Sequence, residues 1–135
     1  MNKDIRILVA EDSAGTRVLV KKILRNLGFS DVDMVEDGVE ALELMQDEDF
    51  DLVISDWIMP NMNGLELVAA IRADKRWEQL PILLVTADEE PENIMLAIRA
   101  GATNYMSKPY DSKVLGEKIQ DIFKFKAKVA QRSKD

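Results

Sequence analysis

Short runs of apolar residues alternate along the chain with longer segments in which apolar residues recur every three or four positions. The short runs predict five β-strands, which we place at Ile5 to Ala10, Val32 to Val35, Asp51 to Ser55, Pro81 to Thr86 and Thr103 to Met106. The first, third and fourth runs are almost continuous in Ile, Leu and Val, as is typical of strands covered on both faces. This pattern predicts a parallel sheet between two layers of helices.

The longer segments predict five helices, because their apolar residues fall on one face of a 3.6-residue period. Polar residues suited to N-caps precede three of them, at Ser13, Asn63 and Asp111. Gly28 and Gly101 follow two of them, where a glycine favours the end of a helix. The helices are expected at residues 14–27, 38–46, 64–73 and 90–100, and from 112 onward. Strand and helix alternating in this way predict an α/β protein with right-handed crossovers.

The composition removes several kinds of chemistry from consideration. The 135 residues include no cysteine and no histidine, which excludes disulfides, thiol nucleophiles, Cys/His zinc sites and imidazole catalysis. Any metal must therefore be a hard cation held by oxygen atoms. The formal net charge of −7 argues against a nucleic-acid or anionic-membrane partner. No apolar run is long enough for a signal peptide or membrane span, so a cytoplasmic protein is predicted.

One shift in composition occurs at the C-terminal end of the chain. From Lys124 to Asp135, five basic residues stand against one acidic residue, which gives +4 and leaves −11 for the rest. We interpret residues 1–125 as one domain and residues 126–135 as a basic helical extension exposed to solvent.

Chemically active side chains follow four of the predicted strands, at Glu11, Asp12, Asp56, Thr86 and Lys108. In parallel α/β sheets the ligand site lies beyond the carboxyl ends of the strands. Three carboxylates in one place repel each other and favour a divalent cation, for which Mg²⁺ is the natural candidate. The hydroxyl and ammonium groups are donors suited to a tetrahedral anion. Together these groups indicate phosphoryl transfer onto an aspartate.

Each of these residues alone has a simpler explanation. Acidic residues after strands are common as helix caps, and a Lys-Pro dipeptide is usually a turn. Those explanations do not account for complementary charges at the ends of four strands.

Four motifs at these positions resemble the receiver domain of two-component response regulators. They are Val9 to Ser13, Ile54 to Gly64, Val85 to Ala87 and Tyr105 to Pro109. The resemblance covers about residues 4–125 and is greatest to the single-domain CheY-type chemotaxis regulators. It implies a flavodoxin-like, doubly wound (βα)₅ fold with a five-stranded parallel sheet of order 2-1-3-4-5.

The resemblance also implies a role for each site residue. Asp56 would be the phosphoacceptor, and Asp12, Asp56 and the Ile58 backbone carbonyl would ligate Mg²⁺, or Mn²⁺ in its place. Glu11 would act through a metal-bound water.

The resemblance also implies roles for Lys108, Thr86 and Tyr105. Lys108 would pair with the phosphoryl group, and the Lys108–Pro109 peptide would be cis. Thr86 would move to donate to a phosphoryl oxygen, and Tyr105 would turn into the space that Thr86 leaves.

The expected partner surface lies on the fourth helix and beside it. Four consecutive apolar residues, Ile94 to Ala97, are too many for one buried stripe, so one or two should be exposed. We expect Ile94 and Met95 to form a partner face with Tyr105 and Lys118. Expected partners are a CheA-like sensor histidine kinase, the flagellar motor switch and a phosphatase, with the protein itself a monomer.

Other functions compete with this interpretation. The chain could be a phosphorelay intermediate or a regulator outside chemotaxis. A haloacid dehalogenase-type phosphatase would carry a second Asp two residues after its nucleophile, where this chain has Ile58. A nucleotide-binding protein is disfavoured because no G-x-G-x-x-G or P-loop motif is present. The leading hypothesis is a signalling module that catalyses only its own phosphorylation and dephosphorylation.

Two positions depart from the receiver pattern. Ile58 stands where the family often has a polar residue, and it cannot orient a water molecule, which predicts slow self-dephosphorylation. Asp88, two residues after Thr86, is the other residue that could orient or repel the water. The acidic run Asp88 to Glu92 predicts an acidic edge on the partner surface.

Overall fold

The computed structural model describes residues 2–87 and 90–134, with side chains as far as Lys124. Strands and helices alternate along the chain as the hydrophobic pattern predicts. In chain order the elements are β1 (Ile7–Ala10), α1 (Ala14–Asn26), β2 (Val32–Val35), α2 (Gly38–Asp47), β3 (Leu52–Asp56), α3 (Gly64–Arg72), η1 (Lys75–Trp77), β4 (Ile82–Thr86), α4 (Pro91–Ala100), β5 (Asn104–Ser107) and α5 (Ser112–Lys134).

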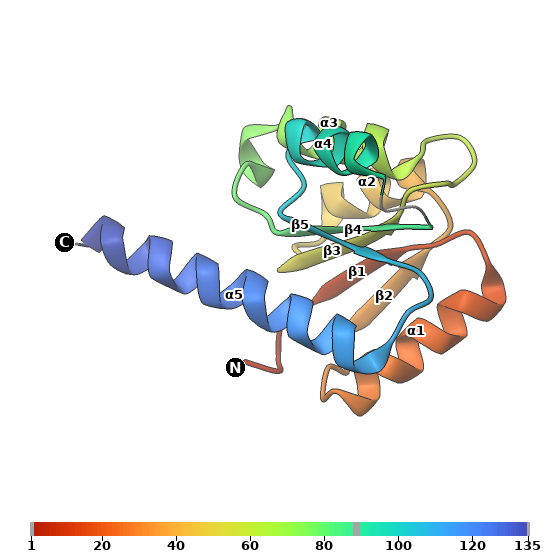
Figure 1. The fold of residues 1–135 in the computed structure, drawn as a ribbon, viewed down its shortest axis with the longest axis horizontal. Helices are drawn as coiled ribbons and strands as arrows, with labels where there is room; N and C mark the ends of the chain where they lie inside the picture. The colour runs from red at the N-terminus through yellow and green to blue at the C-terminus, as the bar shows by residue number, and fades with distance from the viewer. Residues whose placement is uncertain (1, 88–89, 135) are drawn as a thin grey trace.

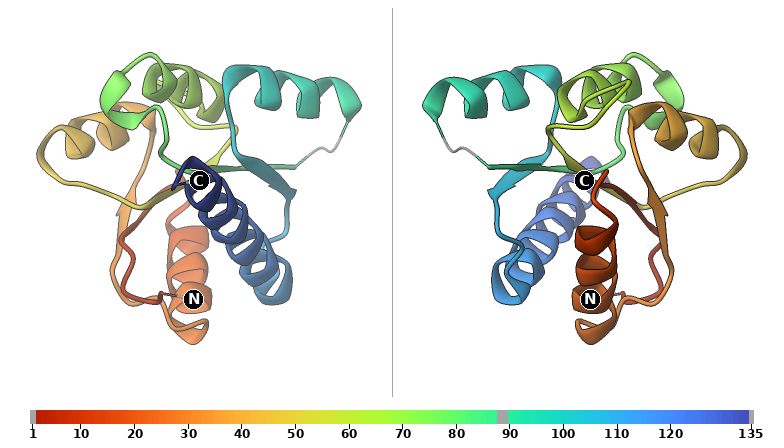
Figure 2. Two further views of the ribbon diagram at one scale, coloured as in Figure 1. Left: turned by 90° about the vertical axis from the view of Figure 1, so that its left-hand side faces the viewer. Right: turned by 90° about the vertical axis from the view of Figure 1, so that its right-hand side faces the viewer.

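The five strands form one parallel sheet in the order β2-β1-β3-β4-β5. Helices α1 and α5 cover one face, and α2, α3 and α4 cover the other (Figures 1 and 2). Each face has its own cluster of buried apolar side chains. This arrangement confirms the predicted doubly wound α/β fold with helices on both faces.

The central and edge strands differ in burial. Every residue of β1, β3 and β4 is buried, which explains why those segments are almost continuously apolar. The edge strands β2 and β5 are only partly buried. The central strands therefore hold the residues that follow them in a rigid frame.

The predicted helix ends are found where the capping residues placed them. Ser13 accepts a hydrogen bond from a backbone N–H of α1, Asn63 forms a capping box at α3, and Asp111 accepts one from the first turn of α5. Gly28 and Gly101 have positive φ angles of 102° and 109°, which glycine adopts without the steric cost of a side chain. Local sequence therefore sets these boundaries.

The structure differs from the sequence prediction at several strand ends and in one short helix. β3 and β5 lie one residue later than predicted, so Asp56 ends β3 instead of following it, and β4 begins one residue later. The first strand begins at Ile7 rather than Ile5, because the Arg6 backbone N–H donates to the Asp51 carboxylate at 2.8 Å instead of to a neighbouring strand. The short helix η1 is not predicted, since three residues capped by Asp74 are too few to show a period.

Helix α5 is the longest element and continues well past the rest of the fold. It runs to Lys134, and its C-terminal part projects beyond the sheet (Figure 1). Residues 126–134 thus continue the helix, while their separation from the 1–125 domain stays a prediction; Asp135 lies outside the described residues. Among the described residues, no helix combines the length and apolar character needed to cross a bilayer.

Candidate functional site

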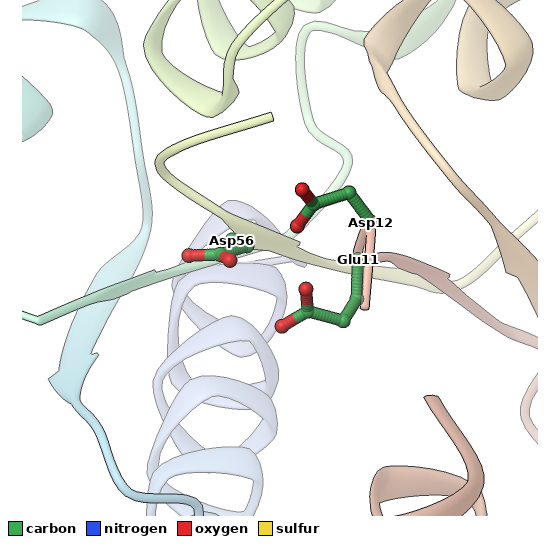
Figure 3. A group of neighbouring side chains, drawn as sticks. All are labelled: Glu11, Asp12 and Asp56. Carbon is green, nitrogen blue, oxygen red and sulfur yellow. The ribbon is translucent and has the colours of Figure 1, made fainter. Parts of the chain in front are cut away.

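Three acidic side chains meet at the carboxyl end of the sheet. Glu11 and Asp12 directly follow β1, and Asp56 is the last residue of β3. Because β1 and β3 are neighbours, with Ala10 paired to Ser55, the residues that come next are brought together. One carboxylate oxygen from each acid lies within 4.8 Å of the others, and the three side chains converge (Figure 3).

Lys108 supplies the positive charge of this cluster. Its Nζ lies 2.8 Å from Asp56 Oδ2 and 3.4 Å from Glu11 Oε1. Its backbone N–H donates to the Thr86 carbonyl, and the peptide bond to Pro109 is cis. Burial is the largest single influence and lowers the pKa of Lys108, but the Asp56 hydrogen bond and the two carboxylate charges together raise that pKa above its ordinary value. The amine is therefore a fixed cation.

Glu11 is fully buried and incompletely bonded. Its Oε2 accepts a hydrogen bond from the Ser13 backbone N–H at 3.0 Å, but Oε1 has no hydrogen-bond partner. Burial, and next the charge of Asp56, raise the pKa of Glu11. A buried carboxylate oxygen that has a charged neighbour but no hydrogen bond is costly unless a ligand completes it. An all-oxygen donor set with one such atom fits a hard divalent cation such as Mg²⁺.

The loop after β3 holds the Asp56 carboxylate in place. The Trp57 backbone N–H donates to Asp56 Oδ1 at 2.8 Å. Gly64 packs so closely that a side chain there would overlap the Asp56 backbone oxygen, and its N–H donates to the Trp57 carbonyl. Ile58 turns its side chain to solvent, with 74% of it exposed. The predicted role of its carbonyl as a metal ligand stays a prediction.

A cavity of about 260 Å³ opens beside the Asp56 carboxylate. It is lined by Asp56, Trp57, Ile58, Thr86, Ala87, Asn93 and Lys108. Its polar lining brings together the Asp56 carboxylate, the Thr86 hydroxyl and the Lys108 ammonium that the sequence singles out. The carboxamide of Asn93 was not predicted, because it lies in the first turn of α4 and belongs to none of the four motifs. Asp88, the other residue considered for this region, lies outside the described residues.

Thr86 and Tyr105 lie on the same face of the sheet, the one covered by α4. Thr86 ends β4 and is buried, whereas Tyr105 of β5 pairs with Leu84 and is half-buried. Successive side chains of a strand point to opposite faces, so Leu84, Thr86 and Tyr105 share one side. Lys118 Nζ lies 5.1 Å from the centre of the Tyr105 ring.

Helix α4 exposes more apolar surface than the sequence indicates. Of the four residues Ile94 to Ala97, two are exposed (Met95 and Leu96), as the pattern predicts. Ile94, placed in the expected partner face, is half-buried, and Ala97 is buried. Ile98 is 54% exposed, and the prediction from sequence missed it because it considered only the run Ile94 to Ala97.

The amino-acid sequence that builds this site matches the model of a known family. The model of the response regulator receiver domain matches residues 7–120. This chain belongs to the response regulator receiver family. As a receiver domain it is a module for phosphorylation-switched signalling rather than a classical enzyme.

Curated and solved relatives agree with this assignment. Chemotaxis protein CheY-3 of Vibrio cholerae is 41% identical over 123 residues, which cover 91% of this chain and 95% of that protein. The structure of chemotaxis response regulator CheY4 of Vibrio cholerae superposes with a TM-score of 0.83 at 34% identity, over 88% of this chain and 98% of that one. A sensor histidine kinase receiver domain from Pseudomonas aeruginosa, solved with magnesium coordinated in its active-site cleft, has a TM-score of 0.79 at 26% identity, over 87% and 96%.

Proposed function

We propose that this receiver accepts a phosphoryl group on Asp56 from a CheA-like sensor histidine kinase. Phosphorylation then changes the affinity of the face formed by α4, β5 and α5 for a flagellar motor switch protein. The observation that carries the proposal is the placement of the buried Asp56 carboxylate 2.8 Å from Lys108 and beside two further acids. The relatives named as chemotaxis proteins favour this output over a phosphorelay role.

Mg²⁺, or Mn²⁺ in its place, would be held by Asp12, Asp56 and the Ile58 carbonyl, with Glu11 acting through a metal-bound water. The orphaned Glu11 Oε1 and the all-oxygen donor set support this assignment, as does the magnesium in the related Pseudomonas aeruginosa receiver. Bound there, the cation supplies positive charge that offsets the repulsion between the acidic cluster and an incoming phosphoryl group.

The transfer itself needs one nucleophile and one cation from this chain. An Asp56 carboxylate oxygen forms a bond to phosphorus, the bond from phosphorus to the donor's imidazole nitrogen breaks, and that nitrogen keeps the electron pair. Lys108, already 2.8 Å from Asp56, then pairs with a phosphoryl oxygen. The donor supplies the histidine, so the chain needs none of its own.

The switch follows from the shared face of Thr86 and Tyr105. The Thr86 hydroxyl donates to a phosphoryl oxygen, and Tyr105 turns into the space that this movement leaves. Tyr105 is half-buried beside Lys118 in this structure, so its rotation changes the surface next to Lys118 of α5. Phosphate stabilises the inward state because it bonds better to that state.

Labelling with a small phosphodonor tests the acceptor. We expect incubation with Mg²⁺ and acetyl phosphate to attach one phosphoryl group per chain, as resolved by phosphate-affinity electrophoresis. Asp56→Asn should abolish the label, and Asp37→Asn, at the same end of the sheet, should keep it. A label that survives in Asp56→Asn, or multiple turnover of a generic phosphate ester, would contradict the proposal.

Binding measurements with beryllofluoride, a mimic of the phosphoryl group, test the output. The treated protein should bind a motor switch protein more tightly than the untreated protein, by calorimetry. Met95→Asp should weaken that binding, and Val18→Asp, on the opposite face, should not. Equal binding by treated and untreated protein would favour a phosphorelay role instead.

A further inference from the structure

Asn93 places a carboxamide in the wall of the acceptor cavity. It lies in the first turn of α4, is half-buried, and lines the cavity with Asp56 and Lys108. Its backbone N–H is bonded to the Glu90 carbonyl. No hydrogen bond joins its side chain to any other residue that the structure describes. Within the described residues, the carboxamide is thus a polar group without a structural hydrogen bond.

The proposed function, on which this inference rests, leaves one position in the cavity to be filled. A phosphoryl group on Asp56 has three free oxygens, which are assigned to the metal, to Lys108 and to Thr86. The remaining polar approach to phosphorus is the one taken by a water molecule that hydrolyses the acyl phosphate. The carboxamide of Asn93 is the polar side chain in the described lining that no phosphoryl oxygen requires.

Two other side chains of the described lining, Ile58 and Trp57, cannot orient such a water. Ile58 is apolar and 74% exposed. Trp57 offers an indole N–H, which donates a hydrogen bond but cannot accept one. A carboxamide oxygen accepts a hydrogen bond from water, and this directs a water lone pair away from the carboxamide and toward the cavity.

We propose that Asn93 positions the water that hydrolyses the Asp56 phosphate. Its Oδ1 accepts a hydrogen bond from the water, whose oxygen forms a new bond to phosphorus. The bond between phosphorus and the Asp56 oxygen breaks, and the carboxylate keeps the electron pair. One proton of the water stays on the released phosphate and the other passes to solvent; the amide orients the water and takes no proton.

The decay of the phosphorylated protein measures this role. The parent and Asn93→Leu are labelled with acetyl phosphate and Mg²⁺, the donor is removed by desalting, and the label is followed over time. We expect Asn93→Leu to decay about tenfold more slowly, the scale of one lost hydrogen bond. The initial rate of label uptake and the melting temperature should not change. Asn93→Ala should show the same slower decay, and this second variant controls for any packing defect caused by the larger leucine side chain.

Two further variants separate positioning from a structural effect. Glu92→Leu alters the exposed neighbour on the same turn and should leave the decay rate unchanged. Adding Ile58→Asn to Asn93→Leu supplies a carboxamide on the opposite wall, and we expect it to restore most of the lost rate.

Different outcomes would overturn the role of Asn93 and the proposed function. Decay of Asn93→Leu and Asn93→Ala within twofold of the parent would overturn the role of Asn93, and so would a matching loss of uptake. Failure of the parent to take up label, or label retained in Asp56→Asn, would instead overturn the proposed function, and this inference with it.

Discussion

Acidic residues gather around one cation at each end of the β-sheet. At the amino end, the Arg6 guanidinium lies 2.9 Å from Glu48, 3.2 Å from Asp33 and 3.5 Å from Asp31, and it donates to the Asp49 carbonyl. The side chain that bridges these groups is planar and carries five donors, so one residue serves several acceptors. All these acids are partly exposed, and water completes their solvation.

The carboxyl end also has several acidic residues around one cation, but two of its acids are buried and their bonding is less complete. Lys108 bonds Asp56 directly, while Glu11 is fully buried with one oxygen lacking a hydrogen bond. A cluster that is completely paired stabilises structure, whereas one that is buried and incomplete is suited to a ligand. The number of acidic residues therefore does not identify a ligand site, whereas a buried carboxylate oxygen without a hydrogen bond does.

Loss of an acidic residue should affect ligand binding only at the carboxyl end. We expect Asp12→Asn to weaken Mg²⁺ binding about tenfold or more, since a charged oxygen ligand is removed. Titration of Trp57 fluorescence with Mg²⁺ measures this, because Trp57 borders the cavity. Asp33→Asn, at the amino end, is the matched control and should titrate like the parent. Equal affinities in all three proteins would contradict the contrast between the two ends.

A polar side chain added beside the cavity at the carboxyl end should shorten the lifetime of the phosphorylated protein. Ile58→Asn supplies a carboxamide that can orient water, and we expect several-fold faster decay of the phosphorylated protein. Val18→Asn changes an equally exposed apolar residue on α1 and should leave the decay unaltered. If Ile58→Asn decays no faster than the parent, slow self-dephosphorylation does not arise at this position.

Asp37 offers a test within the carboxyl end itself, because it is an acid whose bonds are complete. It caps α2 through the Glu40 backbone N–H and accepts a 2.7 Å hydrogen bond from Asn61. These bonds, the backbone one first, lower the pKa of Asp37 below its ordinary value of 3.8. Asp37→Ala should cost about 1 kcal/mol of unfolding free energy at neutral pH, while Mg²⁺ affinity stays unchanged.

The pH dependence of that cost has a definite sign. A carboxyl whose pKa is lowered on folding stabilises the protein above its unfolded pKa and loses this contribution as pH falls through the folded one. The difference between parent and Asp37→Ala in urea unfolding should therefore shrink as pH drops below about 3.8. A difference that is constant with pH would show that the carboxylate charge is not what stabilises the cap.

The smallest effect is expected at the amino end. Arg6→Met removes the shared cation, so Asp31, Asp33 and Glu48 repel each other and the melting temperature falls slightly. Sodium chloride screens that repulsion and should narrow the gap between variant and parent. Phosphorylation of Asp56 should proceed unchanged. A variant that melts like the parent at low salt would mean that the Arg6 network does not contribute to stability.

Sequence predicts most of the fold because the informative patterns here are local. Continuous apolar runs identify β1, β3 and β4, and the caps at Ser13 and Asn63 set helix starts that the structure confirms. The convergence of Glu11, Asp12 and Asp56 is also predictable, because parallel strands carry the residues that follow them to one edge.

What sequence cannot predict depends on contacts between distant segments. That Glu11 Oε1 lacks a hydrogen bond follows only from the packing of distant segments of the chain, which bury this oxygen. Asn93 enters the cavity through the placement of α4, and Gly64 is required because it packs on the backbone of Asp56. The extra exposed residue Ile98 depends on the rotation of α4 over the sheet.

The site draws its residues from nearly the whole length of the chain. Glu11 follows the first strand and Lys108 the last, and Asp56 lies on β3, one of the two strands between them in the sheet. No shorter stretch of the polypeptide contains both the acid cluster and its cation. A fragment that stops before β5 therefore contains the three acids but not the cation that pairs with Asp56. Under the proposed function, only a chain folded as far as Lys108 has a complete site for the phosphoryl group.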